Sequence, residues 1–489
     1  MRSTKIVATL GPSTDDEAKL RRTLGAGVDV VRLNFSHGRA DDHRIRAEAV
    51  RRHADALGRD IGVLCDLQGP KIRVESFVAG HAELIEGASF ALDTEMAPDA
   101  GTARVVGCAY QALPQDVRVG DTLLLNDGAI VLRVQAVAGS RVDTEVVVGG
   151  ILGDRKGINR QGGGLSAAAL TDKDRADILH AVALGADFIA VSFPREAEDM
   201  LEARRLVMQA GGRAQLIAKI ERAEALQNLE AIIEASDGVM VARGDLGVEI
   251  GDAELPGWQK RIIWAARERN RMVITATQMM ESMISSPIPT RAEVLDVANA
   301  VMDGTDAVML SAETATGRFP VKVIEAVARV CIGAEASLYL RPEPIQRRPD
   351  VHFQRTDEAI AMATAWTANQ MHAKAIIALT ESGATALLMS RTDTRIPIYA
   401  LTQHEGTRRR MSLCRGVYPI AFVPSRLDTL APVREAVSCL EERGAVAVGD
   451  RVLITKGDFT GPGGTNAMKI VSVGEVPAEF PNVGTPPLS

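Results

Sequence analysis

The sequence predicts an α/β protein built on a (β/α)8 TIM barrel, with an inserted small β-barrel lid domain and a C-terminal three-layer α/β domain. Three observations support this prediction. Over the first two thirds of the chain, short runs of Val, Ile, Leu and Ala alternate with amphipathic helical segments. One connection, residues 71–156, is long and rich in alternating strand patterns. A new alternation of helices and strands begins near residue 357.

Eight apolar runs account for the strands of the predicted barrel. Their composition is typical of parallel strands that are buried on both faces. Gly-Val-Asp at 27–29 and Gly-Ala-Asp at 185–187 each end a helical segment and lead into the next strand. The expected strands are residues 5–10, 29–34, 61–67, 187–193, 215–221, 238–243, 272–277 and 306–311. The expected helices are residues 15–24, 41–57, 172–184, 196–209, 223–235, 258–269, 291–302 and 321–340.

The insertion at 71–156 follows the third expected strand and shows no helical pattern. Alternating apolar and polar residues at 121–125, 129–134 and 142–148 predict short strands. The insertion leaves and returns at the carboxyl ends of the barrel strands, where active sites form in this fold. We therefore expect it to act as a movable lid.

The C-terminal part is expected to form a separate domain behind a polar, proline-containing linker at 341–350. Helices are predicted at 357–371, 385–390, 407–413 and 433–442, and strands at 374–379, 396–401, 417–423, 451–454 and 467–473. The predicted domains are a barrel of residues 1–70 and 157–340, a lid of 71–156, a C-terminal domain of 341–474 and a frayed tail of 475–489.

The composition excludes several classes of function. The 489 residues include 63 acidic and 56 basic side chains, a formal net charge of −7, and only 3% aromatics, which argues against a nucleic-acid partner. No apolar run approaches the roughly 18–20 residues that cross a bilayer, and no signal peptide is recognised, so no membrane partner is expected. Five scattered cysteines fit a reducing, cytoplasmic location. The motifs of P-loop and dinucleotide-binding sites are absent.

Polar residues stand at the ends of seven of the eight expected strands, where a barrel interior should be apolar. Many are two residues apart, a spacing that places both side chains on one face of a strand. Because a buried charge is costly unless it is paired or binds a metal, we expect these side chains to converge on one site. They are Arg32, Asn34, Ser36, Asp66, Ser192, Lys219, Glu221, Arg243, Asp245, Thr275, Thr277, Ser311 and Glu313.

The residue types limit the chemistry of this site. Glu221 and Asp245 end adjacent strands and offer hard oxygen ligands, which suit Mg²⁺ or Mn²⁺ better than Zn²⁺. Lys219 and Arg32 add positive charge, and Gly244 offers backbone N–H groups to an anion. These residues by themselves predict a Mg²⁺-dependent barrel enzyme that acts on a small phosphorylated acid.

Over nearly its whole length the sequence resembles the pyruvate kinases, of bacterial type and of the K⁺-independent subgroup. The ordered set of motifs, together with the position of the insertion, makes the resemblance specific. It implies a barrel, a lid and a C-terminal regulatory domain. The motifs are KIVATLGP at 5–12, RLNFSHG at 32–38, KIE at 219–221, MVARGDLG at 240–247, TATQM at 275–279 and MLSAET at 309–314.

The resemblance implies Mg²⁺-dependent phosphoryl transfer from phosphoenolpyruvate to ADP, which gives pyruvate and ATP in the final step of glycolysis. Glu221 and Asp245 would hold the metal, Lys219 would neutralise the phosphoryl group in transfer, and Arg32 would clamp it. Thr277 would help deliver a proton to the enolate carbon. Arg243, Gly244 and Asp245 match substrate-binding positions of the family. Asn34, His37, Arg73 and Lys156 match positions near the nucleotide. The family also suggests a homotetramer.

One departure from the family concerns the monovalent cation. Many members bind K⁺ near the positions of Asn34, Ser36, Asp66 and the residue after it, with a nearby glutamate. Here Leu67 has no side-chain oxygen, and Lys71 replaces the glutamate. Because an ammonium can stand in for a monovalent cation, we expect an enzyme that does not need K⁺. A second departure is the glycine-rich run at 157–164, which leaves the lid hinge undefined.

An anion site is expected in the C-terminal domain. The loop Thr380–Thr385, including Ser382 and Gly383, follows a strand and opens a helix. The family places an effector's phosphate there, beside a second loop that here contains Gly463 and Thr465. We expect activation by a phosphorylated sugar or nucleotide. The run Arg408–Arg410 is expected to be a solvated helix face.

Two other readings stay open. A Mg²⁺-dependent aldolase or lyase can stabilise an enolate in a similar barrel without a lid, a phosphoryl clamp or ADP. A metabolite sensor on an inactive barrel is disfavoured by the intact Lys219, Glu221, Asp245 and Thr277. A dikinase would need a phosphorylatable histidine on a mobile domain, and the sequence offers no candidate domain for it.

Overall fold

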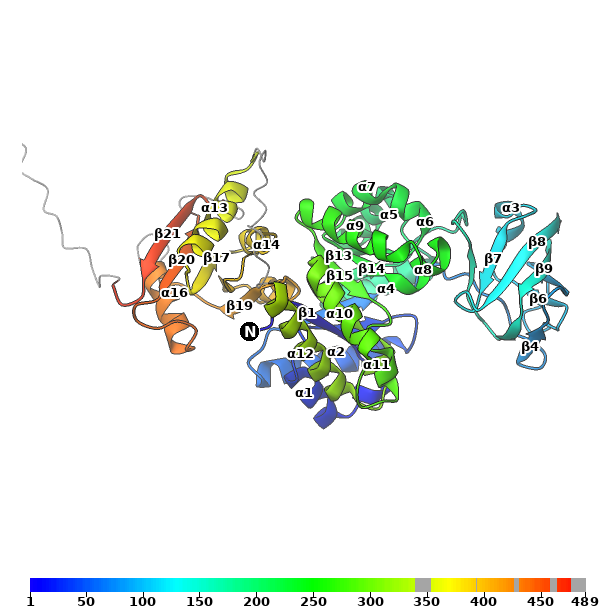
Figure 1. The fold of residues 1–489 in the computed structure, drawn as a ribbon, viewed down its shortest axis with the longest axis horizontal. Coiled ribbons are helices and arrows are strands. Elements are labelled where there is room, and N and C mark those ends of the chain that lie inside the picture. Colours follow the sequence, from blue (N-terminus) through cyan, green and yellow to red (C-terminus); the bar gives the residue numbers. More distant parts are fainter. Residues whose placement is uncertain (339–352, 393, 426–430, 458–463, 476–489) are drawn as a thin grey trace, which may run out of the picture. The chain divides into compact units, whose positions relative to one another are not determined.

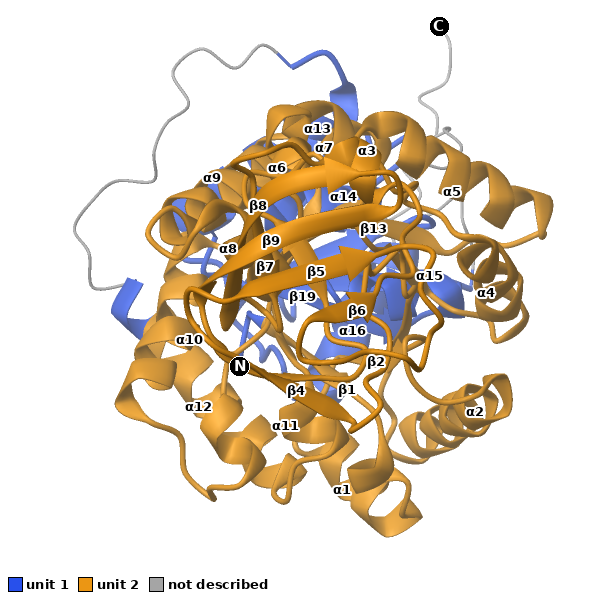
Figure 2. Cartoon of the chain, turned by 90° about the vertical axis from the view of Figure 1, so that its right-hand side faces the viewer, with its two compact units in different colours: residues 1–4, 336–489 blue, residues 5–335 orange. Residues whose placement is uncertain are grey.

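The computed structural model describes residues 1–338, 353–392, 394–425, 431–457 and 464–475. The chain forms two compact units, one of residues 5–335 and one of residues 1–4 with 336–489 (Figure 2). The linker predicted at 341–350, and the predicted tail after residue 475, lie outside the described residues. Within the described ranges, no helix is long and apolar enough to cross a membrane.

Eight parallel strands close into a barrel in the order β1-β16-β15-β14-β13-β12-β3-β2. The strands β1, β13, β14 and β15 of this barrel are labelled in Figure 1. Their side chains are almost all buried, because helices cover the outside and packed residues fill the inside. Every predicted barrel strand is present to within two residues at each end, so the fold class is confirmed. The strands are β1 (Lys5–Thr9), β2 (Val30–Asn34), β3 (Gly62–Asp66), β12 (Phe188–Val191), β13 (Gln215–Ile220), β14 (Gly238–Ala242), β15 (Met272–Ala276) and β16 (Ala307–Leu310).

The helices of the barrel largely follow the predicted segments. The helix expected at 223–235 is two helices, α6 (Ala223–Gln227) and α7 (Leu229–Ala235), interrupted at Asn228. Two short helices that the sequence did not predict, α8 (Arg243–Ile250) and α11 (Ala312–Ala315), begin directly at strand ends. The others are α1 (Glu17–Gly25), α2 (Ala40–Ala56), α4 (Asp172–Ala183), α5 (Ala197–Gln209), α9 (Leu255–Glu268), α10 (Arg291–Asp303) and α12 (Pro320–Leu338), with 3-10 turns η1 (Pro12–Thr14) and η2 (Glu281–Ile284).

The inserted segment forms a six-stranded sheet of order β11-β7-β8-β9-β5-β6 and a two-stranded sheet, β10-β4. The insertion has an apolar core of its own, to which Phe90, Leu123 and Leu132 contribute. The insertion also contains a one-turn helix, α3 (Leu113–Asp116), although the sequence predicted no helix there. The strands are β4 (His81–Leu84), β5 (Ser89–Asp93), β6 (Val105–Gly107), β7 (Thr122–Leu125), β8 (Ile130–Ala138), β9 (Arg141–Val148), β10 (Gly150–Gly153) and β11 (Ile158–Arg160).

The second unit is built on a five-stranded sheet of order β19-β18-β17-β20-β21, in which only β21 is antiparallel to its neighbour. Alternate side chains face opposite sides of the sheet, so Ile377 and Ile454 pack with Val437 of α16 while α13 and α14 pack together on the sheet. The elements are α13 (Thr356–Gln370), β17 (Ala375–Leu379), α14 (Ala384–Ser390), β18 (Ile398–Thr402), α15 (Glu405–Met411), β19 (Val417–Ala421), α16 (Ala431–Glu442), β20 (Arg451–Lys456) and β21 (Ala467–Ser472).

The N-terminal residues belong to this second unit. The Gly416 amide donates a hydrogen bond to the Ser3 carbonyl (3.0 Å), and the Tyr418 hydroxyl donates one to the Arg2 carbonyl (3.1 Å). The exact domain boundaries given above remain predictions.

Candidate active site

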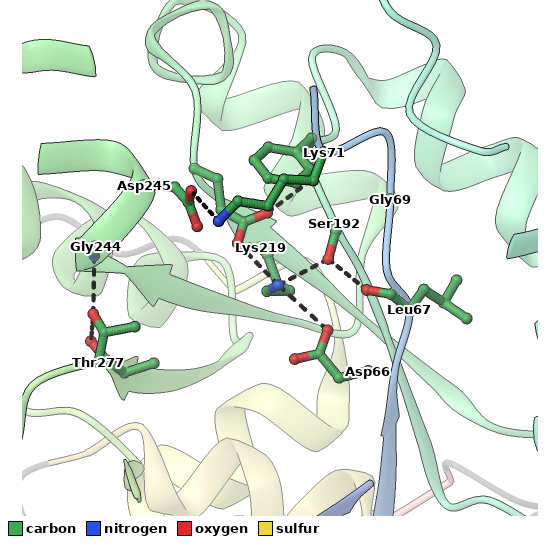
Figure 3. A network of polar contacts seen from close by, with 12 residues as sticks. Asp66, Leu67, Gly69, Lys71, Ser192, Lys219, Gly244, Asp245 and Thr277 are labelled. Atoms are coloured by element: carbon green, nitrogen blue, oxygen red, sulfur yellow. Dashed lines mark hydrogen bonds and ion pairs between the residues drawn. The ribbon is translucent and has the colours of Figure 1, made fainter. Parts of the chain in front are cut away.

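Lys219 is the centre of a polar cluster at the carboxyl ends of β3, β12 and β13 (Figure 3). Its ammonium donates a hydrogen bond to Ser192 Oγ (2.8 Å) and forms ion pairs with Glu221 Oε1 (2.9 Å) and Asp66 Oδ1 (3.3 Å). Burial by itself would lower the pKa of Lys219, but the charges of Asp66 and Glu221 more than offset this and hold it above its usual value. The ammonium is therefore charged before any substrate arrives.

Arg32, at the end of β2, shares Asp66 with Lys219. Arg32 Nε lies 2.7 Å from Asp66 Oδ2, and Nη1 donates to Thr9 Oγ1 at 3.0 Å. Burial would raise the pKa of Asp66, yet Lys219 and Arg32 hold it below its ordinary value. The two bonds of Arg32 use Nε and Nη1, and none to Nη2 is present within the described chain. That edge of the guanidinium can accommodate an anion.

Glu221 follows β13 directly and is 2% exposed. Glu221 Oε2 accepts a hydrogen bond from the Phe193 amide (2.9 Å), which is presented by a left-handed backbone with φ of 56°. Burial raises the pKa of Glu221, the Lys219 charge opposes that, and the nearby charge of Asp245 adds to it. Glu221 is buried and Asp245 is half-buried, and two carboxylates that repel each other in such a place form a natural site for a cation.

The donor set of this pair fits a hard divalent cation. Glu221 and Asp245 supply only oxygen atoms, as Mg²⁺ and Mn²⁺ prefer. Among the described residues, no group of three or more His, Cys, Asp or Glu side chains gathers into a metal site. A cation here would therefore depend on substrate and water for its remaining ligands, which is typical of Mg²⁺ at phosphate sites.

Asp245 lies in the first turn of α8, where the Lys71 ammonium reaches it at 3.3 Å (Figure 3). Lys71 also lies 4.0 Å from Asp127, in the turn between β7 and β8. Within the described chain, the contacts of Lys71 do not extend to Asn34, Ser36 or Asp66, with which the sequence had grouped it. The lysine thus stands beside the predicted metal ligands.

Thr277 and Gly244 lie together. The Gly244 amide donates to Thr277 Oγ1 (2.9 Å), and the Thr277 hydroxyl donates to the Ala276 carbonyl (2.6 Å). Thr277 and Gln278 have φ of 69° and 54°, in the left-handed region. This conformation is strained for the β-branched Thr277. The Gly244 amide, which the sequence offered to an anion, is therefore engaged by Thr277 in this structure.

Arg243 does not face the same way as Asp245, contrary to the spacing argument. The two residues lie in helix α8 rather than in a strand, and helical residues two apart point in very different directions. Arg243 instead donates to the carbonyls of Ala276 (3.1 Å) and Thr277 (2.5 Å) and pairs with Asp296 (2.6 Å). It braces the strained segment that carries the Thr277 hydroxyl.

The same argument fails at two other strand ends. Glu313 lies in α11 and accepts hydrogen bonds from the amides of Ser311 (2.6 Å) and Met280 (3.3 Å). Thr275 is fully buried, and its hydroxyl donates to Thr305 Oγ1 (3.0 Å). These side chains support the loops of the barrel rather than the Lys219 cluster.

The residues predicted to bind the nucleotide are spread over three segments. Asn34 ends β2, and its Oδ1 accepts from the Ser36 amide (3.1 Å), while the neighbouring His37 is exposed. Arg73 and Lys156 lie on the two connections of the lid, and Arg73 donates to the Arg155 carbonyl (2.9 Å). Leu67 packs in the barrel core and contributes only its carbonyl, which accepts from Ser192 Oγ (2.7 Å).

The predicted effector loops meet in the second unit. Thr380 Oγ1 accepts from the Gly383 amide (2.9 Å), next to Ser382. The Thr385 and Thr465 hydroxyls are hydrogen-bonded at 2.6 Å, so the two loops are joined by their threonines. Gly463 lies outside the described residues. In the basic run of α15, Arg409 pairs with Glu405.

Sequence reasoning missed several contributors to the barrel site. Thr9, Phe193, Asp127 and Glu249 gave no signal of their own, because each acts through a long-range contact. A hint existed at Asn126-Asp127-Gly128, a turn sequence that here takes three consecutive left-handed residues.

Comparison with known proteins gives a consistent result. The family model described as the pyruvate kinase barrel domain matches residues 1–324, and that of the pyruvate kinase alpha/beta domain matches residues 358–471. The chain is 52% identical over 478 residues to pyruvate kinase II of Salmonella typhimurium, covering 97% of this chain and 99% of the relative. It is also 52% identical over 461 residues to a pyruvate kinase of Haemophilus influenzae, covering 94% and 96%. A crystal structure of a pyruvate kinase from Cryptosporidium parvum superposes with a TM-score of 0.86 at 34% identity, covering 96% of each chain.

Proposed function

The chain belongs to the pyruvate kinase family, and from this premise we propose that its Lys219 cluster transfers the phosphoryl group of phosphoenolpyruvate to ADP. The observation that carries the proposal is the Lys219 ammonium, held between Asp66, Glu221 and Ser192 at the strand ends. The bond from phosphorus to the enol oxygen breaks and a bond to a β-phosphate oxygen of ADP forms. The enolate that remains takes up a proton at carbon and becomes pyruvate.

We propose that Glu221 and Asp245 hold a divalent cation, Mg²⁺ or Mn²⁺. Both carboxylates are hard oxygen donors, and burial together with the nearby Asp245 charge raises the pKa of Glu221, so a bound cation would relieve the repulsion between them. When bound, such a cation neutralises the carboxylate and phosphoryl oxygens of the substrate.

Lys219 and Arg32 are proposed to bind the phosphoryl group during transfer. The transition state of such a transfer is loose and spreads negative charge over the phosphoryl oxygens, so catalysis depends mainly on positioned positive charge. Asp66 holds the two positively charged side chains in place, one with each carboxylate oxygen, so their arrangement does not have to form during the reaction. Ser192 limits the rotation of the Lys219 ammonium.

Thr277 is proposed to help deliver the proton to the enolate carbon, through a water molecule. Its hydroxyl is held in one orientation by the Gly244 amide and the Ala276 carbonyl. Arg243, predicted as a substrate ligand, would act by keeping that segment in its strained conformation. Asn34, His37, Arg73 and Lys156 are proposed to contact the nucleotide.

We further propose that the enzyme does not require K⁺. The support is the Lys71 ammonium, whose permanent positive charge lies 3.3 Å from Asp245, beside the proposed metal ligands rather than at Asn34, Ser36 and Asp66. Leu67 offers no side-chain oxygen to such a cation.

Activation by a phosphorylated sugar or nucleotide at the Thr380–Thr385 loop is proposed on the strength of its hydroxyls and of the Thr385–Thr465 contact. A homotetrameric assembly and a cytoplasmic location are proposed by analogy with the family.

The initial rate of pyruvate formation from phosphoenolpyruvate, ADP and Mg²⁺ tests the function, first in K⁺-free buffer and then with K⁺ added. We expect full activity in both buffers. Activity only with K⁺ would keep the phosphotransferase and reject the role of Lys71. Absence of activity in both, even with candidate effectors, would favour an aldolase or lyase, which releases pyruvate from a longer acid without ADP.

A further inference from the structure

The lid returns to the barrel through β11 and three glycines that follow it. Gly162, Gly163 and Gly164 have φ of 80°, 80° and 98°, a region that other residues adopt only under strain. A Cβ at Gly163 would lie 2.6 Å from the Glu224 carboxylate, and one at Gly164 would lie 1.9 Å from Arg160 Nη1. This connection therefore has one specific conformation, set by the side chains around it.

Two barrel glutamates hold the connection. The Glu224 carboxylate accepts a hydrogen bond from the Gly164 amide. Glu249 makes two contacts: its backbone carbonyl accepts from the Gly162 amide (2.9 Å), and its Oε1 accepts from Asn159 Nδ2 (3.3 Å). Asn159 belongs to β11, which is hydrogen-bonded to β7 of the lid sheet. Glu249 is thus a barrel side chain that bonds directly to the last strand of the lid.

The other carboxylate oxygen of Glu249 binds the segment that follows Glu221. Glu249 Oε2 accepts from the Ala223 amide at 2.9 Å. Ala223 is the first residue of α6 and follows Glu221 by two positions, so its amide has no partner within the helix. Glu249 and Asp245 are four residues apart in α8, which places them on the same face of that helix.

Glu249 lies in buried surroundings, where a charged carboxylate is unfavourable unless hydrogen bonds stabilise it. The side chain is 5% exposed, and burial raises its pKa to about 7, with Glu224 adding to the rise and the Ala223 amide, Asn159 and Arg222 opposing it. A charged carboxylate can accept both N–H bonds at once, whereas an apolar side chain of similar size would leave the two donors without partners.

We propose that Glu249 is a positioning residue for phosphoryl transfer, which ties the return connection of the lid to the segments that carry Glu221 and Asp245. The inference rests on the roles proposed above for those two carboxylates. The Asn159 bond serves the lid and the nucleotide residues on its connections, while the Ala223 bond serves the carboxylate pair. Because the two bonds use different oxygens, they can be removed separately.

Three variants separate the two bonds. Asn159→Ala removes only the lid bond, Glu249→Ala removes both, and the double variant combines them. We expect Asn159→Ala to raise the KM for ADP about tenfold while leaving the Mg²⁺ concentration for half-maximal rate unchanged. Glu249→Ala should raise that Mg²⁺ concentration about tenfold as well. Since both changes act on one contact, the double variant should have the same KM for ADP as Glu249→Ala alone.

Glu293→Gln is the matched control. Glu293, near the start of α10, accepts hydrogen bonds from the backbone amides of Ser282 (2.6 Å) and Thr290 (2.8 Å). Among the described residues it makes no contact with the lid. Hydrogen–deuterium exchange of residues 158–164 in the full enzyme gives a readout independent of activity. It should accelerate in Asn159→Ala and Glu249→Ala and stay unchanged in Glu293→Gln.

Multiplicative effects on the KM for ADP in the double variant, or unaltered exchange in Asn159→Ala, would overturn the proposal. Asn159→Ala carries the test even if Glu249→Ala does not fold. If the wild-type enzyme is active and the Glu249→Ala variant has the same kinetics, the role of Glu249 is rejected while the proposed function stands. A wild-type enzyme that forms no pyruvate would instead reject the roles given to Glu221 and Asp245.

Discussion

The barrel site and the proposed effector loop of the second unit are both expected to bind phosphates, but they are built from different groups. The barrel site uses the full charges of Arg32, Asp66, Lys219 and Glu221, which neutralise one another in a buried place. The effector loop uses the hydroxyls of Thr380, Thr385 and Thr465 and backbone amides. A phosphoryl group in transfer needs charge that is already fixed in place, whereas a ligand that only binds can be held by neutral donors. The two sites should therefore respond very differently to substitution.

The largest effect is expected from Lys219→Met. Removing the ammonium takes away the charge that we propose binds the transferred phosphoryl group, and it leaves Asp66 and Glu221 less well neutralised, so kcat should fall about 10²–10³-fold. Steady-state kinetics with phosphoenolpyruvate and ADP measure this. Lys260→Met is the control, because Lys260 is exposed and pairs with Asp303 rather than with the Lys219 cluster. A kcat within threefold of wild type for Lys219→Met would contradict the proposed role.

Thr277→Val should lower kcat about 100-fold while changing the KM for phosphoenolpyruvate little, because the role we propose for the hydroxyl is proton delivery rather than binding. Thr277→Ser keeps the hydroxyl and should recover most of the rate. The comparison of the two variants by kcat and KM separates the hydroxyl from the strained backbone that both share. Equal losses in the two variants would assign the effect to the backbone.

Lys71→Glu tests which charge balances Asp245. The substitution places a carboxylate beside Asp245 and Asp127 and should create a need for K⁺, with activation on the order of tenfold when K⁺ is added. Lys71→Met, which removes the charge without reversing it, is the companion variant. Rates are measured in K⁺-free and K⁺-containing buffers of equal ionic strength. A Lys71→Glu enzyme that K⁺ leaves unchanged would reject the role of Lys71.

The smallest effect is expected in the second unit. Thr385→Val removes one neutral hydrogen bond, to Thr465, and should cost about 1 kcal/mol in the free energy of unfolding. The basal rate should stay at the wild-type value, while activation by a phosphorylated sugar or nucleotide should be lost. Thermal unfolding and phosphoenolpyruvate saturation curves with and without the effector measure the two parts. Unaltered activation would move the effector away from this loop.

The architecture was predictable because it is written in local patterns. Continuous apolar runs identified every barrel strand to within two residues, since a strand buried on both faces requires them. The helix at 243–250 escaped notice because Gly244 and Gly247 lower its helical propensity and its first residues resemble a strand end. Because this helix was not predicted, Arg243 was wrongly expected to face the same site as Asp245.

The candidate site was predicted in composition but not in its connections. The strand ends place Arg32, Asp66, Lys219 and Glu221 together because parallel strands of a closed barrel end at the same rim. Nothing local indicates that Lys71 meets Asp245 or that Thr277 takes up the Gly244 amide. These contacts join residues far apart in the chain.

By itself, the sequence determined the order of the elements, the apolar content of each strand and the residue types that end them. These follow from periodicity and burial, which are properties of short segments. Only the tertiary structure decided that Arg243 braces the Thr277 segment, that Lys71 pairs with Asp245, and that Glu249 joins the lid to the barrel wall. The reason is physical: a side chain's partner is selected when the barrel closes and the lid connections pack on it, and those contacts span up to 174 residues between Lys71 and Asp245.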